Sequence, residues 1–597
     1  MSEQHTLCAA FQATARQHPD LVALRTPGGA VSITWREYAR RVRAIAAGLA
    51  ARGVGHGDAV GIMLTNRPEF HLVDTAALHL GALPFSVYNT SAPDQLTHVF
   101  ANAGNRIVVT EAAFVATLRA AAPGLRLVCV DGPVDGGETL ADLEAAGDPD
   151  FDLDTAWRAV APDDLATIIY TSGTTGPPKG VELTHANLMA VSGAVKNAFE
   201  LLPGDRVISF LPSAHIADRV VSHYASLLFG TVVTSLADPR RLGEVLPEVR
   251  PHLFFAVPRV WQKFKLAVDT ALAAEPSPAK RAVAAWAVDV GVRRARLRAA
   301  DRPVPIRLGL AHRVADRLVL ARLRARLGLT EAKVPASGAA AIPVEILEFF
   351  WGVGIPVYEI WGMSETAGLG TSGRPGANRL GTVGTPVHGT EVRVADDGEL
   401  LIRGPSVMRG YRGDPGRTAE TVDPDGWVHT GDVGVIDPDG YVSIVDRKKE
   451  LIINSAGKNM SPTNIENAIK AASGVIGQVV AIGDDRPYIS ALVVLDQDAA
   501  AGLAAAHGLP TASPGAVVAA DEVRALVTAA VRTGNARLSR VEQVKRFRIV
   551  PAFWEPGGDE LTPTLKLRRK PIAEKYAHAI DDMYADQPTE ETVNLGA

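Results

Sequence analysis

The stretch from residue 166 to 180 constrains this chain more than any other. It reads ATIIYTSGTTGPPKG, so a short apolar run with β-strand character passes directly into hydroxyl residues and glycines, closed by two prolines and a lysine. Glycine lets backbone N–H groups approach an anion, hydroxyls donate further hydrogen bonds, and Lys179 adds a positive charge. We therefore predict a strand that leads into a phosphate-binding loop. The GxxxxGK[ST] spacing of the Walker loop is absent, and the competing interpretation is an ordinary polar turn.

The size and composition of the chain set limits on its class. With 597 residues it is too long for one hydrophobic core, so two or more domains are expected. Hydrophobic residues make up 47% and charged residues 21%, as in folded globular proteins, and the net charge of −5 gives no reason to expect nucleic acid as a partner. Two cysteines, Cys8 and Cys129, cannot form a disulfide framework, which favours a cytoplasmic protein. We find no signal peptide or membrane-spanning stretch.

Alternating patterns predict a parallel α/β architecture in the first part of the chain. The sequence Thr34-Trp-Arg-Glu37 predicts a capping box at the start of a helix that Gly53 ends. Strands and helices then alternate, with strands expected at 59–64, 107–110 and 127–130 and helices at 69–80 and 112–122. Residues 386–445, rich in short strands and turns, predict a small β-barrel-like subdomain. Residues after about 581 are expected to be a frayed polar tail.

The 166–180 stretch resembles the signature YTSGTTGxPKG of the acyl-adenylate-forming superfamily, which includes acyl-CoA synthetases, firefly luciferases and adenylation domains of peptide synthetases. Later motifs resemble bacterial long-chain fatty acid–CoA ligases. The resemblance covers nearly the whole chain and implies an α/β adenylate-forming fold. It implies an N-terminal ATP- and acyl-binding domain over 1–445, with 386–445 as its β-rich part, a charged hinge at 446–450, and a mobile α+β C-terminal domain over 451–597.

The same resemblance implies an ATP site built from several motifs. The chemistry needs a flat apolar face for adenine, a hydroxyl for the α-phosphate and a carboxylate for Mg²⁺, which Trp361, Ser364 and Glu365 supply in order. Ala339 stands where many members of the superfamily have a second glycine. The full set expected to bind ATP or AMP is Thr171, Ser172, Gly173, Thr174, Thr175, Gly176, Lys179, Gly338, Ala339, Ala340, Glu359, Ile360, Trp361, Gly362, Met363, Ser364, Asp432, Ile444 and Arg447, with Thr171 and Glu365 on the metal.

Further positions carry the expected chemistry. Lys566, in the terminal Thr-Pro-Thr-Leu-Lys motif, is implied as the lysine that neutralises charge during adenylation. His215 is expected beside the acyl carboxylate, although a lone histidine is more often structural. Gly457 and Lys458 are expected to contact coenzyme A, and Lys449 to lie at the hinge.

The resemblance implies an AMP-forming ligase that uses ATP, Mg²⁺, a fatty acid and coenzyme A. A fatty acyl-AMP ligase that passes the acyl group to a carrier protein, a ligase for medium-chain or other acids, and a silent lipid-binding scaffold remain alternatives. An Ala- and Arg-rich helical region over 260–328 is either a solvated face or, across 280–326, a basic surface for anionic lipid on the inner face of the membrane. The oligomeric state stays open.

Overall fold

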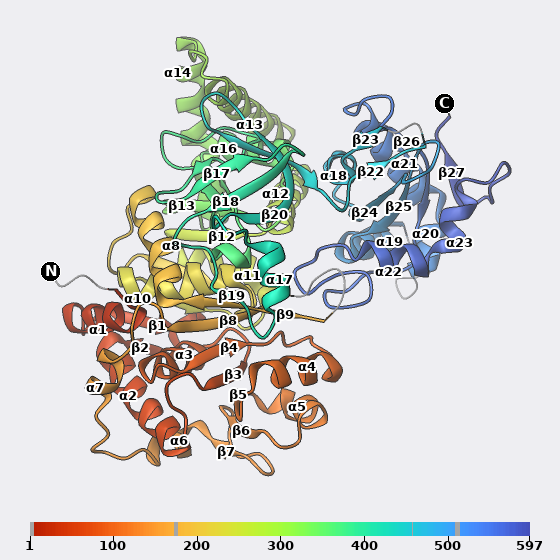
Figure 1. Cartoon of the computed structure of the whole chain (residues 1–597). Coiled ribbons are helices and arrows are strands. Elements are labelled where there is room, and N and C mark those ends of the chain that lie inside the picture. Colours follow the sequence, from red (N-terminus) through yellow and green to blue (C-terminus); the bar gives the residue numbers. More distant parts are fainter. Residues whose placement is uncertain (1–4, 172–176, 456–457, 508–513, 597) are drawn as a thin grey trace.

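The computed structural model describes residues 5–171, 177–455, 458–507 and 514–596. Figure 1 shows a large body, coloured red to green, and a smaller blue body at its side that holds the C-terminal part of the chain. The two bodies meet near Arg447, where strand β21 (Val442–Arg447) of the larger body ends. The predicted hinge, residues 446–450, consists of the last two residues of β21 and the turn that follows it.

A five-stranded parallel sheet lies in the N-terminal part of the large body. Its order is β4-β3-β5-β6-β7, and every neighbouring pair runs parallel, as the alternating pattern predicted. Apolar strand residues such as Val60, Val108 and Leu127 are fully buried in it. The strands are β3 (Ala59–Met63), β4 (Leu83–Ser86), β5 (Ile107–Thr110), β6 (Arg126–Cys129) and β7 (Glu138–Thr139), and the helices of this part are α1 (Leu7–Gln17), α2 (Trp35–Ala51), α3 (Pro68–His79), α4 (Pro93–Ala103), α5 (Val115–Ala121), α6 (Leu140–Ala145) and α7 (Leu153–Arg158).

Helix α2 begins where predicted, but its cap differs in one detail. The Thr34 hydroxyl accepts the Glu37 N–H at 3.3 Å, as in a capping box. The Glu37 carboxylate binds Arg40 at 2.6 and 2.8 Å instead of reaching back to the Thr34 backbone. An arginine one turn further along the helix thus competes for this carboxylate, and only half of the predicted box forms. Gly53 follows the helix with φ of 79°, the left-handed conformation that glycine adopts most easily.

A nine-stranded sheet forms the centre of the large body, in the order β16-β15-β14-β13-β12-β10-β11-β1-β2. Strands β10 to β14 run parallel to one another, so their carboxyl ends share one edge. The strands are β1 (Val22–Arg25), β2 (Ser32–Thr34), β10 (Arg206–Ser209), β11 (Val232–Ser235), β12 (Leu253–Ala256), β13 (Val334–Ser337), β14 (Tyr358–Trp361), β15 (Thr371–Ser372) and β16 (Thr385–Pro386); nearby helices are α8 (His185–Ala198), α9 (Ile216–Asp218), the π-helical turn η3 (Arg219–Tyr224), α10 (Ala225–Phe229), α11 (Leu242–Val249) and α16 (Val344–Gly352).

Two smaller sheets complete the large body. Strands β8 (Leu165–Thr171) and β9 (Lys179–Thr184) form an antiparallel hairpin, and β19 (Gly410–Tyr411) adds to β9. Strands β17 (Glu391–Val394), β18 (Glu399–Arg403), β20 (Val428–Ile436) and β21 form a four-stranded antiparallel sheet, with α17 (Pro415–Thr421) beside it. The predicted β-rich character of 386–445 is therefore present.

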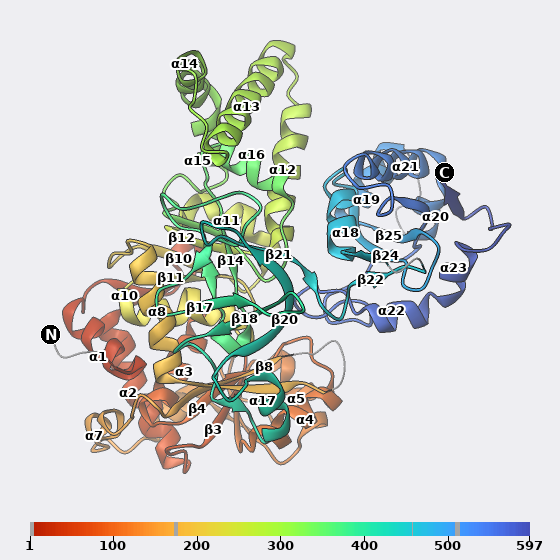
Figure 2. The ribbon, with the colours of Figure 1, turned by 45° about the horizontal axis from the view of Figure 1, so that its top comes forward.

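Helices project from the large body between β12 and β13. They are α12 (Pro258–Ala273), α13 (Pro278–Ala299), α14 (Ile306–Ala315), the π-helical turn η5 (Asp316–Leu320) and α15 (Ala321–Arg326), and Figure 2 shows α13 and α14 standing out from the sheets. Gly291 of α13 packs against α16 so closely that a Cβ would lie 2.3 Å from the Gly352 carbonyl oxygen. Within the described residues no helix is both long and apolar enough to cross a membrane.

The small body is an α+β unit. Strands β24 (Ile476–Ile482), β25 (Ile489–Leu495), β26 (Val544–Ile549) and β27 (Thr592–Asn594) form its sheet, β22 (Ile452–Ile453) and β23 (Asn459–Met460) form a hairpin, and the helices are α18 (Pro462–Lys470), α19 (Gln497–His507), α20 (Pro514–Ala519), α21 (Asp521–Asn535), α22 (Arg569–Lys575) and α23 (Ala577–Asp582). The expected frayed tail after 581 is wrong. Strand β27 pairs with β26, and the Asp582 carboxylate accepts the Thr589 and Thr592 hydroxyls at 2.8 and 2.6 Å. These bonds anchor a polar segment that hydropathy alone would leave free.

Ion pairs join the small body to helix α12 of the large one. Arg259 lies 3.0 Å from Asp496, and Lys263 lies 2.9 Å from Asp498. Both cations lie on the first turns of α12, where the projecting helices begin. These two ion pairs therefore help to fix the position of the small body relative to the large one.

Candidate functional site

Three predicted site segments follow the carboxyl ends of neighbouring parallel strands. The turn 212–215 follows β10, the turn 338–340 follows β13, and Trp361 ends β14. Because these ends share one edge of the sheet, residues far apart in sequence meet there. This edge is where ligands bind in open parallel α/β sheets.

The hairpin β8–β9 carries the predicted phosphate loop. Its last pair in register is Thr171 with Lys179, so both ends of the loop are held together. The Lys179 ammonium lies 5.0 Å from the centre of the Tyr411 ring, a cation–π distance. Ser172, Gly173, Thr174, Thr175 and Gly176 lie outside the described residues.

The backbone is tightly packed where adenine is expected. A Cβ at Gly338 would lie 2.8 Å from the Ile360 carbonyl oxygen, and one at Gly362 would lie 2.6 Å from the backbone of Gly368. Ala339 adopts φ of 67°, a left-handed conformation that costs an alanine energy and that collects at functional sites. The position that usually holds glycine therefore keeps a glycine-like backbone. Ala340 follows in the same turn.

Trp361, Asp432 and Arg447 form one connected group. The Trp361 indole N–H donates to Asp432 Oδ2 at 2.7 Å, and Arg447 Nε lies 2.7 Å from Oδ1 of the same carboxylate. Burial raises the pKa of Asp432, and the Arg447 charge opposes that rise. Ile444 packs beside Trp361 in the small cluster that joins β14 to the β-rich sheet. The bond from the indole N–H to Asp432 therefore fixes the orientation of the tryptophan ring.

Glu365 is held by a residue that sequence reasoning missed. The Tyr411 hydroxyl donates to Glu365 Oε1 at 2.6 Å, and the Met408 N–H donates to the Glu365 backbone carbonyl at 2.8 Å. Glu365 itself lies in the turn η6 (Ser364–Thr366), directly after Met363. Tyr411 stands alone among turn residues in the sequence RGYRG, so no pattern distinguished it.

Glu359 lies in the same wall with an unpaired oxygen. Its Oε1 is buried and, among the described residues, no partner bonds to it. Burial raises the pKa of this carboxyl to about 8. A neutral carboxyl next to the adenine turn could both donate and accept a hydrogen bond. A ligand with donor groups would satisfy it.

His215 begins the short helix α9. Its Nδ1 accepts the Ala217 N–H at 3.2 Å, so in the neutral ring the proton sits on Nε2. Burial lowers the pKa of His215 to about 4, and the charge of Lys566 adds to the effect. The ring is therefore a neutral donor at physiological pH. The charge of Lys566 on the small body thus acts on His215 of the large one.

Lys566 reaches the site from the small body. The surrounding protein and then the Arg447 charge lower its pKa, while Asp432 and Glu365 oppose them. Thr562 shapes the loop that carries it, because the Thr562 hydroxyl accepts the Lys566 N–H at 3.0 Å and the Thr562 N–H donates to the Lys566 carbonyl at 2.9 Å. Leu565 adopts φ of 65° to close this loop. The predicted lysine thus lies within electrostatic reach of three predicted site residues of the large body.

The expected hinge residue Lys449 and the expected coenzyme A residue Lys458 follow β21 along the chain. Lys449 is exposed in the turn after β21, and the Lys458 N–H donates to Asn454 Oδ1 at 2.9 Å in the β22–β23 hairpin. Gly457 lies outside the described residues.

A bound divalent cation would find few protein ligands here. Over the described part of the chain, no three His, Cys, Asp or Glu side chains come together as a metal site. Glu365 offers one carboxylate beside the phosphate hairpin, and Thr171 ends β8 there. One carboxylate is what Mg²⁺ uses when phosphate oxygens and water complete its shell.

Two family models match the chain. Residues 11–412 match the model of the AMP-binding enzyme, and residues 449–588 match the AMP-binding enzyme C-terminal domain. The boundary between them falls near the junction of the two bodies.

The chain is also similar to curated proteins over most of its length. A Mycobacterium tuberculosis protein with the provisional name fatty-acid–CoA ligase fadD11 is 53% identical over 76% of this chain and 79% of its own. The long-chain-fatty-acid–CoA ligase FadD15 of Mycobacterium bovis is 36% identical over 95% of both chains. The long-chain-fatty-acid–CoA ligase ACSBG2 of Gallus gallus is 31% identical over 98% of this chain and 82% of its own.

Solved structures share the fold. A Mycobacterium tuberculosis fatty acyl CoA synthetase superposes with a TM-score of 0.62 at 22% identity, covering 96% of this chain and 99% of its own. ATP-bound MatB from Rhodopseudomonas palustris gives a TM-score of 0.71 at 24% identity, with coverage of 96% and 99%. At these identities the likeness supports the fold alone.

Proposed function

Because the chain belongs to the AMP-binding enzyme family, we propose that it is a long-chain fatty acid–CoA ligase. It would convert ATP, a fatty acid and coenzyme A into acyl-CoA, AMP and diphosphate through an acyl-AMP intermediate. One observation carries this proposal. Lys566 of the small body lies within electrostatic reach of Asp432 and Glu365 of the large body. The names of relatives that are 36% and 31% identical over nearly the whole chain support the long-chain acid and the coenzyme A acceptor.

The first step joins the acid to the α-phosphorus of ATP. Trp361 would stack on adenine, and Asp432 would accept hydrogen bonds from the ribose hydroxyls with Arg447 beside it. Lys179 and the Thr171 hydroxyl would hold phosphate oxygens at the hairpin. Glu365 and Thr171 would hold Mg²⁺, which when bound neutralises phosphate charge.

The carboxylate of the acid needs a donor and a cation near its attacking oxygen. His215 carries its proton on Nε2 and stays neutral, so it can donate to the carboxylate without titrating at physiological pH. Lys566 supplies the cation that stabilises charge as it gathers on the α-phosphate. Its lowered pKa reflects a site that lacks the ligand's negative charge, and a bound nucleotide would favour the protonated ammonium.

The second step transfers the acyl group to the thiol of coenzyme A, with loss of AMP. We propose that the small body, residues 451–597, turns about Lys449 between the steps, withdrawing Lys566 and presenting Gly457 and Lys458 to coenzyme A. Lys449 is exposed in the turn after β21, which suits a hinge because loops on the surface can change conformation with little loss of buried packing.

Pyrophosphate release tests this proposal against its alternatives. Release is measured from ATP and Mg²⁺ with fatty acids of increasing length, with and without coenzyme A. Turnover that requires coenzyme A and peaks with long chains is expected. A single burst that coenzyme A does not extend would identify an acyl-AMP ligase with a carrier-protein acceptor, a peak at shorter chains would reassign the acid, and no release would leave a silent lipid-binding fold.

We further propose a cytoplasmic enzyme that rests on the inner face of the membrane through the projecting helices. Helix α14 and the turn η5 carry Ile306, Leu310, Val314 and Leu318 at intervals of four residues, and these side chains are 82%, 54%, 52% and 47% exposed. Such a stripe of exposed aliphatic side chains is uncommon on a free surface. Arginines 307, 313 and 317 of the same segment are exposed, as is Arg322 at the start of α15, and none of the four pairs with a carboxylate among the described residues. Aliphatic and cationic groups together suit an anionic lipid surface.

The arginines of α13 contribute less unpaired positive charge to the surface than their number in the sequence suggested. Arg293 pairs with Asp289 at 2.7 Å and Arg296 pairs with Glu348 at 2.7 Å, so part of that cluster is already neutralised. The membrane proposal therefore rests on α14 and η5.

Sedimentation with lipid vesicles tests this contact. Leu310→Gln combined with Val314→Gln should weaken binding to phosphatidylglycerol vesicles and leave activity on a soluble substrate unchanged. Val541→Gln, at a 45% exposed position of the small body, is the matched control. Equal vesicle binding by the double variant and the wild type would mean that α14 is an ordinary solvated helix.

A further inference from the structure

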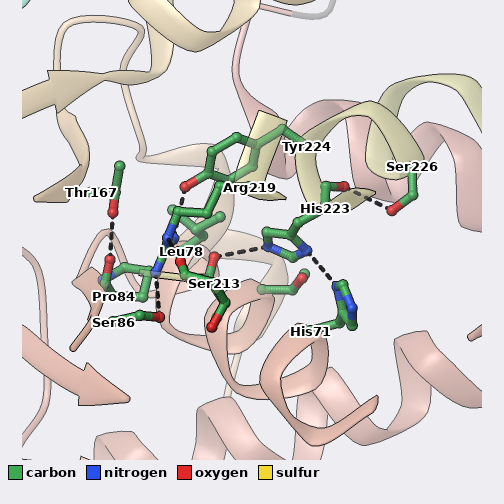
Figure 3. A network of polar contacts seen from close by, with 12 residues as sticks. His71, Leu78, Pro84, Ser86, Thr167, Ser213, Arg219, His223, Tyr224 and Ser226 are labelled. Atoms are coloured by element: carbon green, nitrogen blue, oxygen red, sulfur yellow. Dashed lines mark hydrogen bonds and ion pairs between the residues drawn. The ribbon is translucent and has the colours of Figure 1, made fainter. Parts of the chain in front are cut away.

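A fully buried polar network lies behind the turn that carries His215. Figure 3 shows Arg219 near its centre, His223 beside it, and His71 on the far side of His223. The Arg219 Nη1 lies 2.6 Å from Asp74 Oδ2, and His223 Nε2 lies 2.9 Å from Asp74 Oδ1, with all three side chains shielded from solvent. His223 and His71 meet through their Nδ1 atoms at 3.0 Å. Burying charged groups costs free energy unless every group has its partner. Packing alone therefore does not account for this network.

The guanidinium of Arg219 reaches four segments at once. Its Nε donates to the Ser213 backbone carbonyl at 3.1 Å, and its Nη2 donates to the Ser86 hydroxyl at 3.1 Å. Its Nη1 donates to Tyr224 Oη at 2.8 Å as well as to Asp74. Arg219 thereby joins the 212–215 turn to helix α3 and to the end of strand β4.

Hydrogen bonds to backbone carbonyls hold both ends of the segment before His215, residues 211–213. Asn66 Nδ2 donates to the Leu211 carbonyl at 2.7 Å, and Arg219 holds the Ser213 carbonyl two residues before the histidine. The His215 N–H closes the turn by donating to the Pro212 carbonyl at 2.9 Å. The position of the His215 ring is therefore set from the N-terminal sheet.

We propose that Arg219 is a positioning residue for the fatty acid carboxylate. It touches no substrate, and it acts by fixing the turn that presents His215. This inference rests on the proposed function, in which His215 donates to the acid. The π-helical geometry of η3, where Arg219 begins, supports it, since such turns are frequent at functional sites.

An arginine is needed because this side chain must carry a positive charge and also donate hydrogen bonds in several fixed directions. Its planar fork donates from Nε and both Nη atoms along fixed directions, whereas lysine offers one ammonium on a flexible stem. Arg219→Lys can keep a cation beside Asp74 while it loses the bond to Ser213. The substitution therefore separates the hold on the turn from the buried charge pair.

The experiment compares steady-state kinetics and thermal unfolding of the full chain. Arg219→Lys should raise KM for the fatty acid about tenfold, the effect of losing one hydrogen bond from a charged donor, and change KM for ATP less than about twofold. The matched control is Tyr38→Phe, which removes buried bonds of the Tyr38 hydroxyl to His71 and Thr75 on the same helix α3 but leaves every Arg219 contact. It should lower Tm and leave KM for the fatty acid unchanged.

The readouts separate this inference from the proposed function. An active wild type whose Arg219→Lys variant keeps its KM for the fatty acid, or loses affinity for ATP equally, would overturn the positioning role alone. The same KM increase in Tyr38→Phe would assign the effect to general loosening of α3 and would also overturn it. A wild type that activates no fatty acid would instead refute the proposed function. If Arg219→Lys fails to fold, Asn66→Ala tests the other end of the segment by the same split between the two KM values.

Discussion

The phenolic oxygen of Tyr411 lies 2.6 Å from Glu365 Oε1. The bond joins β19 to the turn after β14, and it fixes the orientation of the carboxylate that we assign to Mg²⁺. Because Lys179 also lies against the Tyr411 ring, one tyrosine supports both the proposed metal ligand and the phosphate lysine.

Tyr411→Phe should therefore weaken the use of Mg²⁺·ATP. The aromatic ring and its contact with Lys179 remain, while Glu365 loses the donor that orients it. We expect pyrophosphate release to fall about tenfold at low Mg²⁺, a loss that corresponds to about 1.4 kcal/mol, and to recover in part as Mg²⁺ is raised. Titration of Mg²⁺ at fixed ATP measures this, with Tyr441→Phe as the control. An unchanged Mg²⁺ dependence would remove Tyr411 from this role.

Lys566→Ala should separate the two half-reactions. Without the ammonium, charge on the α-phosphate is not compensated, so acyl-AMP formation should nearly stop. Thioester formation from supplied acyl-AMP and coenzyme A should largely persist, because the rotation that we propose withdraws the lysine in that step. The two reactions are assayed separately by pyrophosphate release and by acyl-CoA production. Equal loss in both would contradict the assignment.

Thr562→Val tests how the Lys566 loop is held. Valine has nearly the same shape as threonine but cannot accept the Lys566 N–H, so the loop should loosen and acyl-AMP formation should fall about tenfold. Thr564→Val is the matched control, since the Thr564 hydroxyl bonds to Thr562 and not to the lysine backbone. Equal loss in both variants would show that the hydroxyl pair acts as a unit.

Buried histidines predict a loss of stability in mild acid. Burial lowers the pKa of His79 and of His185 to about 4, from about 6.5 in an unfolded chain. The unfolded state therefore binds protons first as pH falls, and stability should drop from about pH 6.5 down to pH 4. Thermal unfolding from pH 7 to pH 5 measures this.

Substitution of His79 isolates one contribution to the dependence of stability on pH. In the native state His79 Nδ1 donates to the Thr75 carbonyl and Nε2 accepts from Gln12, so protonation would place two donors face to face. His79→Gln should reduce the dependence of Tm on pH. A slope equal to that of the wild type would show that this ring does not titrate on unfolding.

Much of the site could be predicted because its residues lie in short contiguous motifs. Trp361 and Glu365, and the lysine of the terminal motif, stand in stretches whose fixed spacing is readable from one sequence. Tyr411 could not be found in that way, since its importance comes only from contact with a residue 46 positions earlier. Arg219 is similar, with partners 133 and 145 positions away. The alternation of strands and helices gave the parallel sheets, but the anchoring of β27 depends on tertiary pairing that hydropathy does not encode.

Helix α12 contacts the small body through the ion pairs of Arg259 and Lys263. The helix leads into the projecting helices α13 and α14, and its ion pairs with Asp496 and Asp498 also join it to the small body that carries Lys566. Because the same helix joins the projecting helices and the small body, the proposed membrane contact and the proposed rotation of the small body would both involve α12.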